Sequence, residues 1–313
     1  MAGSFTFQPQ WLESAGNGTA GPDLILGPDL RLWASWGSGA GTAGGVVAID
    51  PIALTMTNYA HAPIWNPSGI CTDGTVMYVP NSTRGISIYT TAGTETHISA
   101  STIRADLGCV YMGGYIWTTN LGSTIYRTDT LGTVTTNTVT GSVSLQGLCT
   151  DGAFVYVADY NKGGVWTIDS GFAASFTALA GSGPAWTSIG SDGDVWCNDA
   201  LNAGVWNVTT GAFYSLPYVT NRICPSQVYN PVTTLNDMWA TTTATNPTII
   251  LQFSTSGVLE AVYPTQGWSA AGLFSCVIAS TDPLGGNEQL FVGDGDFALW
   301  GVEILTGRFI LQP

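Results

Sequence analysis

Residues 147–169 read GLCTDGAFVYVADYNKGGVWTID and set the pattern for the rest of the chain. A first apolar stretch ends at the turn pair Asp151-Gly152, and a second apolar stretch ends at Asp159. After Asn161 and two glycines a third stretch follows, residues 165–169. An Asp-Gly pair between apolar runs is a strong short-range signal of a β-hairpin. The segment therefore predicts three antiparallel strands.

The same pattern recurs along the chain at intervals of about 40 to 50 residues, the length of one propeller blade. Each copy has an aromatic residue in its second strand, at Trp33, Tyr78, Trp117, Tyr156, Trp196, Trp239 and Phe291. A more polar fourth strand follows the third, as in residues 133–140, and its alternation suits an outer strand with one face in water.

These copies predict an all-β fold, a single β-propeller of seven four-stranded blades over residues 24–313. Six or eight blades are the alternatives, because the last two copies carry insertions at residues 230–236 and 281–287. Residues 1–23 precede the first clear strand, and we expect them to form either an N-terminal arm or a strand that closes the last blade.

Charge is scarce and strongly negative in this chain. Charged residues make up 9% of the 313 residues, the net charge is −14, and the only lysine is Lys162. Such a surface repels phosphate backbones and anionic lipid, so we expect neither nucleic acid nor a membrane surface as partner. The N-terminus lacks the basic and apolar segments of a secretory signal, and no apolar run is long enough to span a bilayer.

The six cysteines and two histidines do not suggest a metal centre. No two cysteines have Cys-x-x-Cys spacing, which argues against zinc, and most lie in apolar strand-like runs such as the one around Cys149. We expect buried free thiols.

A polar residue three positions after the strand-two aromatic is the best candidate for a site. These residues are Asn81, Asn120, Asp159, Asp199 and Asp294, and Trp36 replaces them in the first copy, beside a glycine-rich loop. Equivalent positions of successive blades encircle the axis, so the sequence predicts a polar ring that could bind a ligand. Carboxylate oxygens suit calcium, which makes Asp159, Asp199 and Asp294 the candidate metal ligands; otherwise we expect no cofactor. The alternative is that each side chain accepts hydrogen bonds from its own loop as an Asx turn.

The segment quoted first resembles a blade of the NHL and YVTN repeat families, with a Val-Tyr-Val-Ala-Asp strand, an asparagine and a Gly-Val strand in that order. The streptogramin lyases have similar blades, and that resemblance implies a magnesium ion with His and Glu at the channel mouth. Here the only histidines, His61 and His97, fall near outer fourth strands. We therefore expect a streptogramin-lyase-like fold without the catalytic His/Glu set of that family.

Three functions fit these observations. The first is a non-enzymatic structural or binding propeller in a bacteriophage virion, as a tail-fibre, tail-tip or capsid-surface protein, since the chain is rich in Ser, Thr, Gly and Asn and lacks a leader. Its partners would be other virion proteins, in a homo- or hetero-oligomer, or a cell-surface glycan. The second is a metal-dependent lyase or lactonase, and the third is a bacterial glycan- or protein-binding propeller. We expect the chain in the virion, with the cytoplasm as the alternative location.

Overall fold

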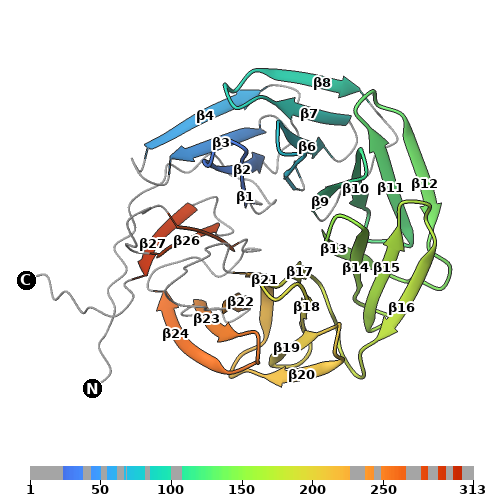
Figure 1. The fold of residues 1–313 in the computed structure, drawn as a ribbon, viewed down its shortest axis with the longest axis vertical. Coiled ribbons are helices and arrows are strands. Elements are labelled where there is room, and N and C mark those ends of the chain that lie inside the picture. Colours follow the sequence, from blue (N-terminus) through green and yellow to red (C-terminus); the bar gives the residue numbers. More distant parts are fainter. Residues whose placement is uncertain are drawn as a thin grey trace, which may run out of the picture.

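The computed structural model describes residues 24–37, 44–50, 55–61, 67, 69–81, 85–99, 108–225, 237–242, 248–265, 276–280, 288–293 and 299–304. These residues form β-sheets arranged in a ring around a common axis (Figure 1). No helix long and apolar enough to cross a bilayer occurs within these ranges. The predicted all-β propeller is therefore confirmed.

Each sheet is an up-and-down meander whose strands follow one another from the axis outward (Figure 1). The first strands are β1 (Leu24–Leu26), β5 (Cys71–Thr72), β9 (Cys109–Met112), β13 (Leu145–Thr150), β17 (Thr187–Ile189), β21 (Thr220–Pro225) and β25 (Cys276–Ser280). The second strands are β2 (Leu32–Gly37), β6 (Met77–Asn81), β10 (Tyr115–Thr119), β14 (Phe154–Asp159), β18 (Val195–Asn198), β22 (Asp237–Thr242) and β26 (Glu288–Gly293).

The third and fourth strands lie toward the rim. The third strands are β3 (Gly44–Asp50), β7 (Gly85–Tyr89), β11 (Thr124–Asp129), β15 (Gly164–Asp169), β19 (Gly204–Asn207), β23 (Thr248–Ser254) and β27 (Leu299–Ile304). The fourth strands are β4 (Thr55–His61), β8 (Glu95–Ser99), β12 (Val134–Thr138), β16 (Ala174–Ala178), β20 (Ala212–Ser215) and β24 (Leu259–Thr265). His61 and His97 lie in β4 and β8, so the prediction that both histidines fall on outer strands is confirmed.

Among the described residues six sheets have four strands, so the prediction of seven four-stranded blades is corrected to six, the smaller alternative. The sheet β25–β26–β27 has three strands in the described part of the chain, and β25 contacts both β21 and β1. This sheet therefore lies between the last four-stranded blade and the first. Residues 1–23, predicted to be an arm or a closing strand, lie outside the described residues.

The predicted aromatic residues all lie in second strands. Trp33, Tyr78, Trp117, Trp196 and Trp239 are buried there. The Asp-Gly pairs form the turns between first and second strands, as predicted, and their glycines have positive φ, which a residue with a Cβ rarely adopts: Gly74 at 88°, Gly152 at 89° and Gly193 at 83°.

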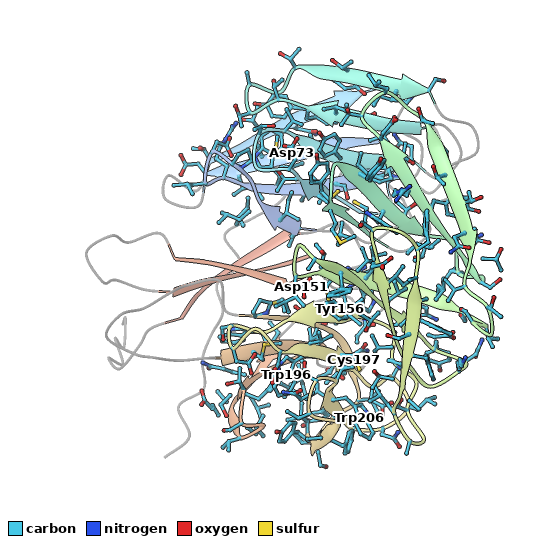
Figure 2. All side chains as sticks on the ribbon, turned by 45° about the vertical axis from the view of Figure 1, so that its right-hand side comes forward. Asp73, Asp151, Tyr156, Trp196, Cys197 and Trp206 are labelled. Carbon is cyan, nitrogen blue, oxygen red and sulfur yellow. The ribbon has the colours of Figure 1, made fainter. Side chains whose placement is uncertain are left out.

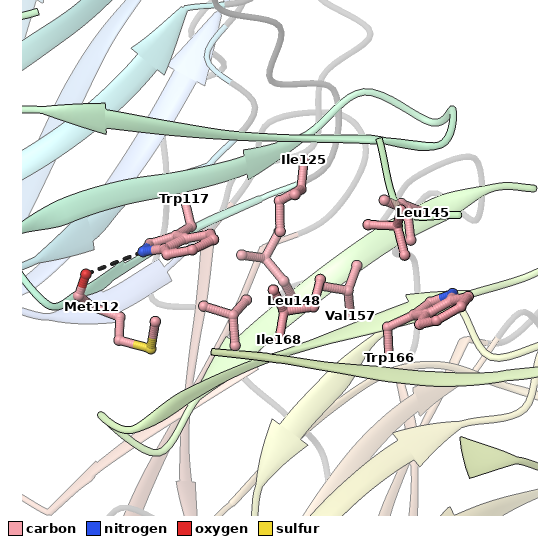
Figure 3. Packing of buried hydrophobic residues seen from close by; sticks show 10 residues of the cluster. Met112, Trp117, Ile125, Leu145, Leu148, Val157, Trp166 and Ile168 are labelled. Carbon is pink, nitrogen blue, oxygen red and sulfur yellow. Dashed lines mark hydrogen bonds between the residues drawn. The ribbon is translucent and has the colours of Figure 1, made fainter. Parts of the chain in front are cut away.

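Apolar side chains fill the space between neighbouring sheets. Figure 3 shows one such cluster, in which Trp117 and Ile125 pack against Leu148, Val157 and other residues of the next sheet. The Trp117 indole Nε1–H donates to the carbonyl oxygen of Met112 at 3.1 Å, which satisfies its only polar atom. Wedge-shaped cores of this kind hold each sheet at a fixed angle to its neighbours.

The ring has two faces. The turn face carries the turns that join first to second and third to fourth strands, and the loop face carries the loops that join second to third strands and one sheet to the next. The loops of neighbouring sheets contact one another on the loop face, where Leu145 N donates to Gly122 O at 2.8 Å. Neighbouring sheets also contact one another on the turn face, where Arg127 donates to Ser170 O. Side chains from different blades therefore converge on the same face.

Candidate functional site

The predicted polar ring lies on the loop face. Asn81 and Asp159 end β6 and β14, and Asn120 and Asp199 directly follow β10 and β18. These four residues therefore occupy matching places in four consecutive blades. Asp294 lies outside the described residues.

Trp36 lies in strand β2 rather than in a loop. Its partner across the sheet is Gly45 of β3, so the hairpin continues through residues that the sequence assigned to a glycine-rich loop. The glycines on both sides of the turn left no strand signal in the sequence. The side chain of Trp36 is outside the described part of the structure.

Asp159 is fully buried and binds the loops around it. Its Oδ1 accepts hydrogen bonds from Ser144 N at 3.0 Å and Lys162 N at 3.2 Å. Its Oδ2 accepts from Val143 N at 3.1 Å and from the Trp166 indole Nε1 at 3.0 Å. A carboxylate offers about four lone-pair positions. Donors from the incoming loop, the outgoing loop and β15 therefore fill the hydrogen-bonding capacity of this side chain.

Asp199 repeats this arrangement in the next blade. Its Oδ1 accepts from the backbone N–H groups of Gly183 at 3.1 Å, Leu201 at 2.9 Å and Asn202 at 3.1 Å. Its Oδ2 accepts from Asn202 Nδ2 at 2.9 Å and from the Trp206 indole Nε1 at 3.1 Å. Asp199 is also fully buried, so this carboxylate joins the loop before β17 to the loop before β19.

The amide residues of the ring follow a related scheme. Asn120 Oδ1 accepts from Gly122 N at 3.1 Å, and Asn120 Nδ2 donates to the Tyr126 hydroxyl at 3.1 Å. Asn81 Nδ2 donates to Ser87 Oγ at 3.3 Å. In each blade the ring residue thus bonds to a side chain near the start of the third strand.

Burial and hydrogen bonding act in opposite directions on the ring carboxylates. Burial raises the pKa of Asp159, but hydrogen bonds from donors such as Trp166, Ser144 and Val143 together lower it by more than burial raises it. The net shift of the pKa is therefore downward. Burial likewise raises the pKa of Asp199, and donors led by Asn202 and Leu201 bring it below the ordinary value. Both side chains are therefore held as carboxylates at neutral pH, with their charge balanced by N–H dipoles.

A second set of matched positions lies closest to the axis. In each first strand one residue pairs with the aromatic residue of the second strand, and the position of interest lies two residues before it. In five successive blades this position holds Gly69, Gly108, Gly147, Trp186 and Arg222. Three glycines are thus followed by a large aromatic residue and a cation at the loop-face mouth of the inner strands.

Trp186 occupies the space that these glycines leave. A Cβ added at Gly147 would lie 2.3 Å from Trp186 Cε3, and one added at Gly108 would lie 3.2 Å from Trp186 Cζ3. Gly108 belongs to a blade that does not neighbour the blade of Trp186. Contact across non-neighbouring blades is possible only near the axis, so the indole lies near the axis at the loop-face end of the inner strands.

Arg222 stacks on the indole from the next blade. Its guanidinium carbon lies 3.4 Å from the centre of the Trp186 ring, and both side chains are buried. Asn198 fixes this pair: its Oδ1 accepts from Ala185 N at 3.1 Å and Trp186 N at 2.7 Å, and its Nδ2 donates to Thr220 O at 2.9 Å. A buried cation–π pair therefore lies near the axis, at the loop-face end of the inner strands.

The turn face carries carboxylates of a different kind. The Tyr156 hydroxyl donates to Asp151 Oδ2 at 2.8 Å, and Figure 2 shows where these two residues lie. The Tyr78 hydroxyl donates to Asp73 Oδ2 at 2.8 Å. Burial raises the pKa of Tyr156 to about 12, helped by the hydrogen bond to Asp151. Asp151 is exposed and Asp73 is half-buried, and both fix their Asp-Gly turns, as the sequence predicted.

Two further groups have little part in the site. Five cysteines, Cys71, Cys109, Cys149, Cys197 and Cys224, are free thiols, and all but Cys149 are buried. In the outer strand β8, on the rim, His97 Nδ1 lies 3.3 Å from Ser87 Oγ. Within the described ranges no three His, Cys, Asp or Glu side chains are grouped so that they could hold a metal ion.

Comparison with known proteins relates the chain to other propellers. No protein-family model and no curated protein sequence matches it. Among solved structures, a virginiamycin B lyase from Staphylococcus aureus matches with a TM-score of 0.70 at 15% identity, covering 93% of this chain and 97% of that one. A catalytically inactive form of that lyase, solved with quinupristin, has a TM-score of 0.73 at 14% identity, covering 96% and 100%.

The WD40 β-propeller domain of Doa1 also matches, with a TM-score of 0.63 at 10% identity, covering 93% of this chain and 95% of that domain. Proteins with unrelated activities thus share this architecture, and at such identities the likeness is one of fold. The chain is an all-β protein whose fold is a single β-propeller with streptogramin-lyase-like neighbours.

Proposed function

We propose that this chain is a non-enzymatic propeller that binds another molecule through its loop face and serves as a part of a larger assembly. The observation that carries this proposal is the hydrogen bonding of Asp159 and Asp199. Each buried carboxylate accepts at least four hydrogen bonds from its own loops, so its lone pairs are used to hold the loop face in shape. A catalytic acid or a metal ligand needs lone pairs that face a substrate or an ion.

The loops held in this way present apolar side chains to solvent. Leu121, Val143 and Leu201 are exposed by 48%, 57% and 57% on the loop face. Tyr160 is half-buried beside them. Rigid loops that display apolar groups favour the binding of a surface, because little conformational entropy is lost when the partner docks.

A bacteriophage particle is the assembly we propose, with the chain as a tail-fibre, tail-tip or capsid-surface component. The support is compositional: 9% charged residues, 40 glycines and one lysine in a chain with 45% hydrophobic residues. In that setting the partners are other virion proteins or a neutral surface glycan, and no cofactor is required.

Sedimentation of lysates from cells that make the native chain tests this proposal. The chain is expected in the fast-sedimenting particle fraction, and it should stay there when the membranes are removed with detergent. Recovery of the chain only as a free, slowly sedimenting protein would contradict the proposal. Leu201→Asn should shift the chain out of the particle fraction, whereas Leu30→Asn, on the turn face, should leave it there.

A further inference from the structure

The acidic residues of this propeller are segregated along its axis. Except for Asp159 and Asp199, every Asp and Glu in the described ranges lies at a turn-face end of a strand or in a turn-face turn: Asp29, Asp50, Asp73, Glu95, Asp129, Asp151, Asp169, Asp192, Asp194, Asp237, Glu260, Glu288 and Glu303. In the described part of the chain, the acidic residues other than Asp159 and Asp199 are thus concentrated on one face of the ring.

The opposite face is almost neutral where β9 to β20 are joined. In these described loops the charged residues are Asp159, Asp199 and Lys162. The two aspartates are buried and fully hydrogen-bonded, as shown above. The Lys162 ammonium lies 4.3 Å from the centre of the Trp166 ring and 4.4 Å from that of Phe176, so the cation is held against aromatic rings. The described loops therefore expose no carboxylate.

Apolar side chains stand close together on this face. A Cβ added at Gly183 would lie 2.6 Å from Leu201 Cγ and 3.0 Å from Tyr160 Cε2, so these two side chains converge over one point of the loop. Val143 adjoins them, because Val143 N bonds to Asp159 and Tyr160 N bonds to Ser144 O at 3.1 Å. With Leu121 they form what we call the apolar patch: Leu121, Val143, Tyr160 and Leu201.

Leu121 is the member of the apolar patch whose backbone conformation is strained. Its φ is 59°, in the left-handed region where asparagine and glycine are the favoured residues. An exposed leucine in that conformation is less stable than an asparagine would be, so the local backbone does not favour leucine there. Leu30 has the same geometry, with φ at 63° and 72% exposure, but it lies on the turn face and is the natural control.

The charge distribution indicates which partner fits the apolar patch. A strand of six residues such as β14 spans about 20 Å, so two rings stacked loop face to loop face hold their acidic turn faces roughly 40 Å apart. That separation is several times the Debye length of about 8 Å at physiological ionic strength. Any contact through a turn face would instead bring carboxylates of two copies together.

We propose that the apolar patch pairs with the same patch of a second copy of this chain, which gives a two-fold symmetric, loop-face-to-loop-face dimer. This inference names a partner for the docking face proposed above and rests on that proposal. The burial of matching apolar tips would drive the association. The described loops that join β9 to β20 expose no carboxylate, so pairing through the apolar patch would avoid close contact between the carboxylates of the two copies there.

Analytical ultracentrifugation of the purified full chain over a range of concentrations at 0.15 M salt tests the inference. The wild-type chain is expected to dimerise, and the triple variant Leu121→Asn, Val143→Thr, Leu201→Asn should weaken the dimer at least about tenfold, equivalent to 1.4 kcal/mol. Leu30→Asn should change the dissociation constant by less than twofold. Both variants place asparagine at a left-handed position, and circular dichroism checks that both remain folded.

Salt gives an independent readout. Raising the salt concentration should leave the dimer unchanged or strengthen it, since only repulsion remains to be screened. A wild-type chain that stays monomeric at every concentration, a dimer that salt dissociates, or an equal effect of the triple variant and Leu30→Asn would each overturn the inference. A monomer that nevertheless sediments with particles would overturn the self-association alone and leave the proposed function standing.

Discussion

The guanidinium carbon of Arg222 lies 3.4 Å from the centre of the Trp186 ring, at the point where the inner strands open on the loop face. The two residues occupy a position that is glycine in the three preceding blades of the ring. The indole extends to Gly147 in the adjacent blade and to Gly108 in the blade beyond it, and Asn198 ties its backbone to the strand that carries Arg222. The pair thus links blades that are not neighbours in the ring.

Gly147→Ala should destabilise the fold. The new methyl group would lie 2.3 Å from Trp186 Cε3 and 2.8 Å from Ala185 O, so the indole must shift. Overpacking of this kind costs about 1–3 kcal/mol in the free energy of unfolding, measured by urea denaturation. Gly171→Ala is the control, since its nearest neighbour would be the Asp169 carboxylate at 3.3 Å and its φ is not positive. In a Trp186→Ala background the cost of Gly147→Ala should become smaller.

Asp159→Asn should cost about 3 kcal/mol in unfolding free energy, because an amide accepts through one oxygen and turns its NH₂ group toward N–H donors that the carboxylate had satisfied. Asp192→Asn, at an exposed turn where the aspartate accepts from Asp194 N at 3.1 Å, should cost less than about 0.5 kcal/mol. Equal losses for the two variants would show that the buried network has no special part in stability.

The lowered pKa of Asp159 makes the stability loss of Asp159→Asn depend on pH. A carboxyl group whose pKa is lower in the folded than in the unfolded state stabilises the fold above the unfolded pKa, about 3.9, and the stabilisation is lost as pH falls through the folded pKa. The gap in unfolding free energy between wild type and Asp159→Asn should therefore be constant from pH 5 to 7 and shrink below about pH 4. A gap that widens in acid would contradict the assigned direction of the shift.

The turn-face pair of Tyr156 and Asp151 predicts the reverse dependence. The pKa of Tyr156 is raised to about 12, so its contribution is complete below the unfolded pKa near 10 and is lost as pH rises toward 12. Ultraviolet titration of tyrosinate should show a component that titrates near pH 12, and Tyr156→Phe should remove part of it. Tyr156→Phe should also cost about 1 kcal/mol at pH 7 through the loss of the 2.8 Å hydrogen bond.

The repeat could be predicted from sequence because its signals are local. Asp-Gly turns such as Asp151-Gly152 and the aromatic residues of second strands each report on a few neighbouring residues, and the structure places all of them as expected. The position of Asp159 and Asp199 on matching strand ends followed from the same spacing. Their donors did not, because Val143 and Gly183 belong to loops whose distance from the ring depends on how successive blades pack.

The sequence contained weaker signals for the pair of Trp186 and Arg222 and for the apolar patch. Trp186 follows Gly69, Gly108 and Gly147 at a regular interval, which could have marked it as the residue that fills the centre, but the sequence alone does not tell which side of an inner strand faces the axis. In the sequence Leu121 and Leu201 are ordinary loop residues, because their grouping with Val143 and Tyr160 depends on how neighbouring blades pack. The count of complete blades depended on the last part of the chain, where insertions obscure the repeat.

The central claim is that Asp159 and Asp199 hold the loop face in shape rather than bind a cation. Thermal unfolding of the wild-type chain with and without millimolar calcium or magnesium tests it most directly, alongside the variant Asp159→Asn with Asp199→Asn. We expect the melting temperature of the wild type to stay the same with either metal, and the variant to melt lower by the same amount in every buffer. A melting temperature that rises with metal in the wild type, and no longer rises in the variant, would contradict the claim.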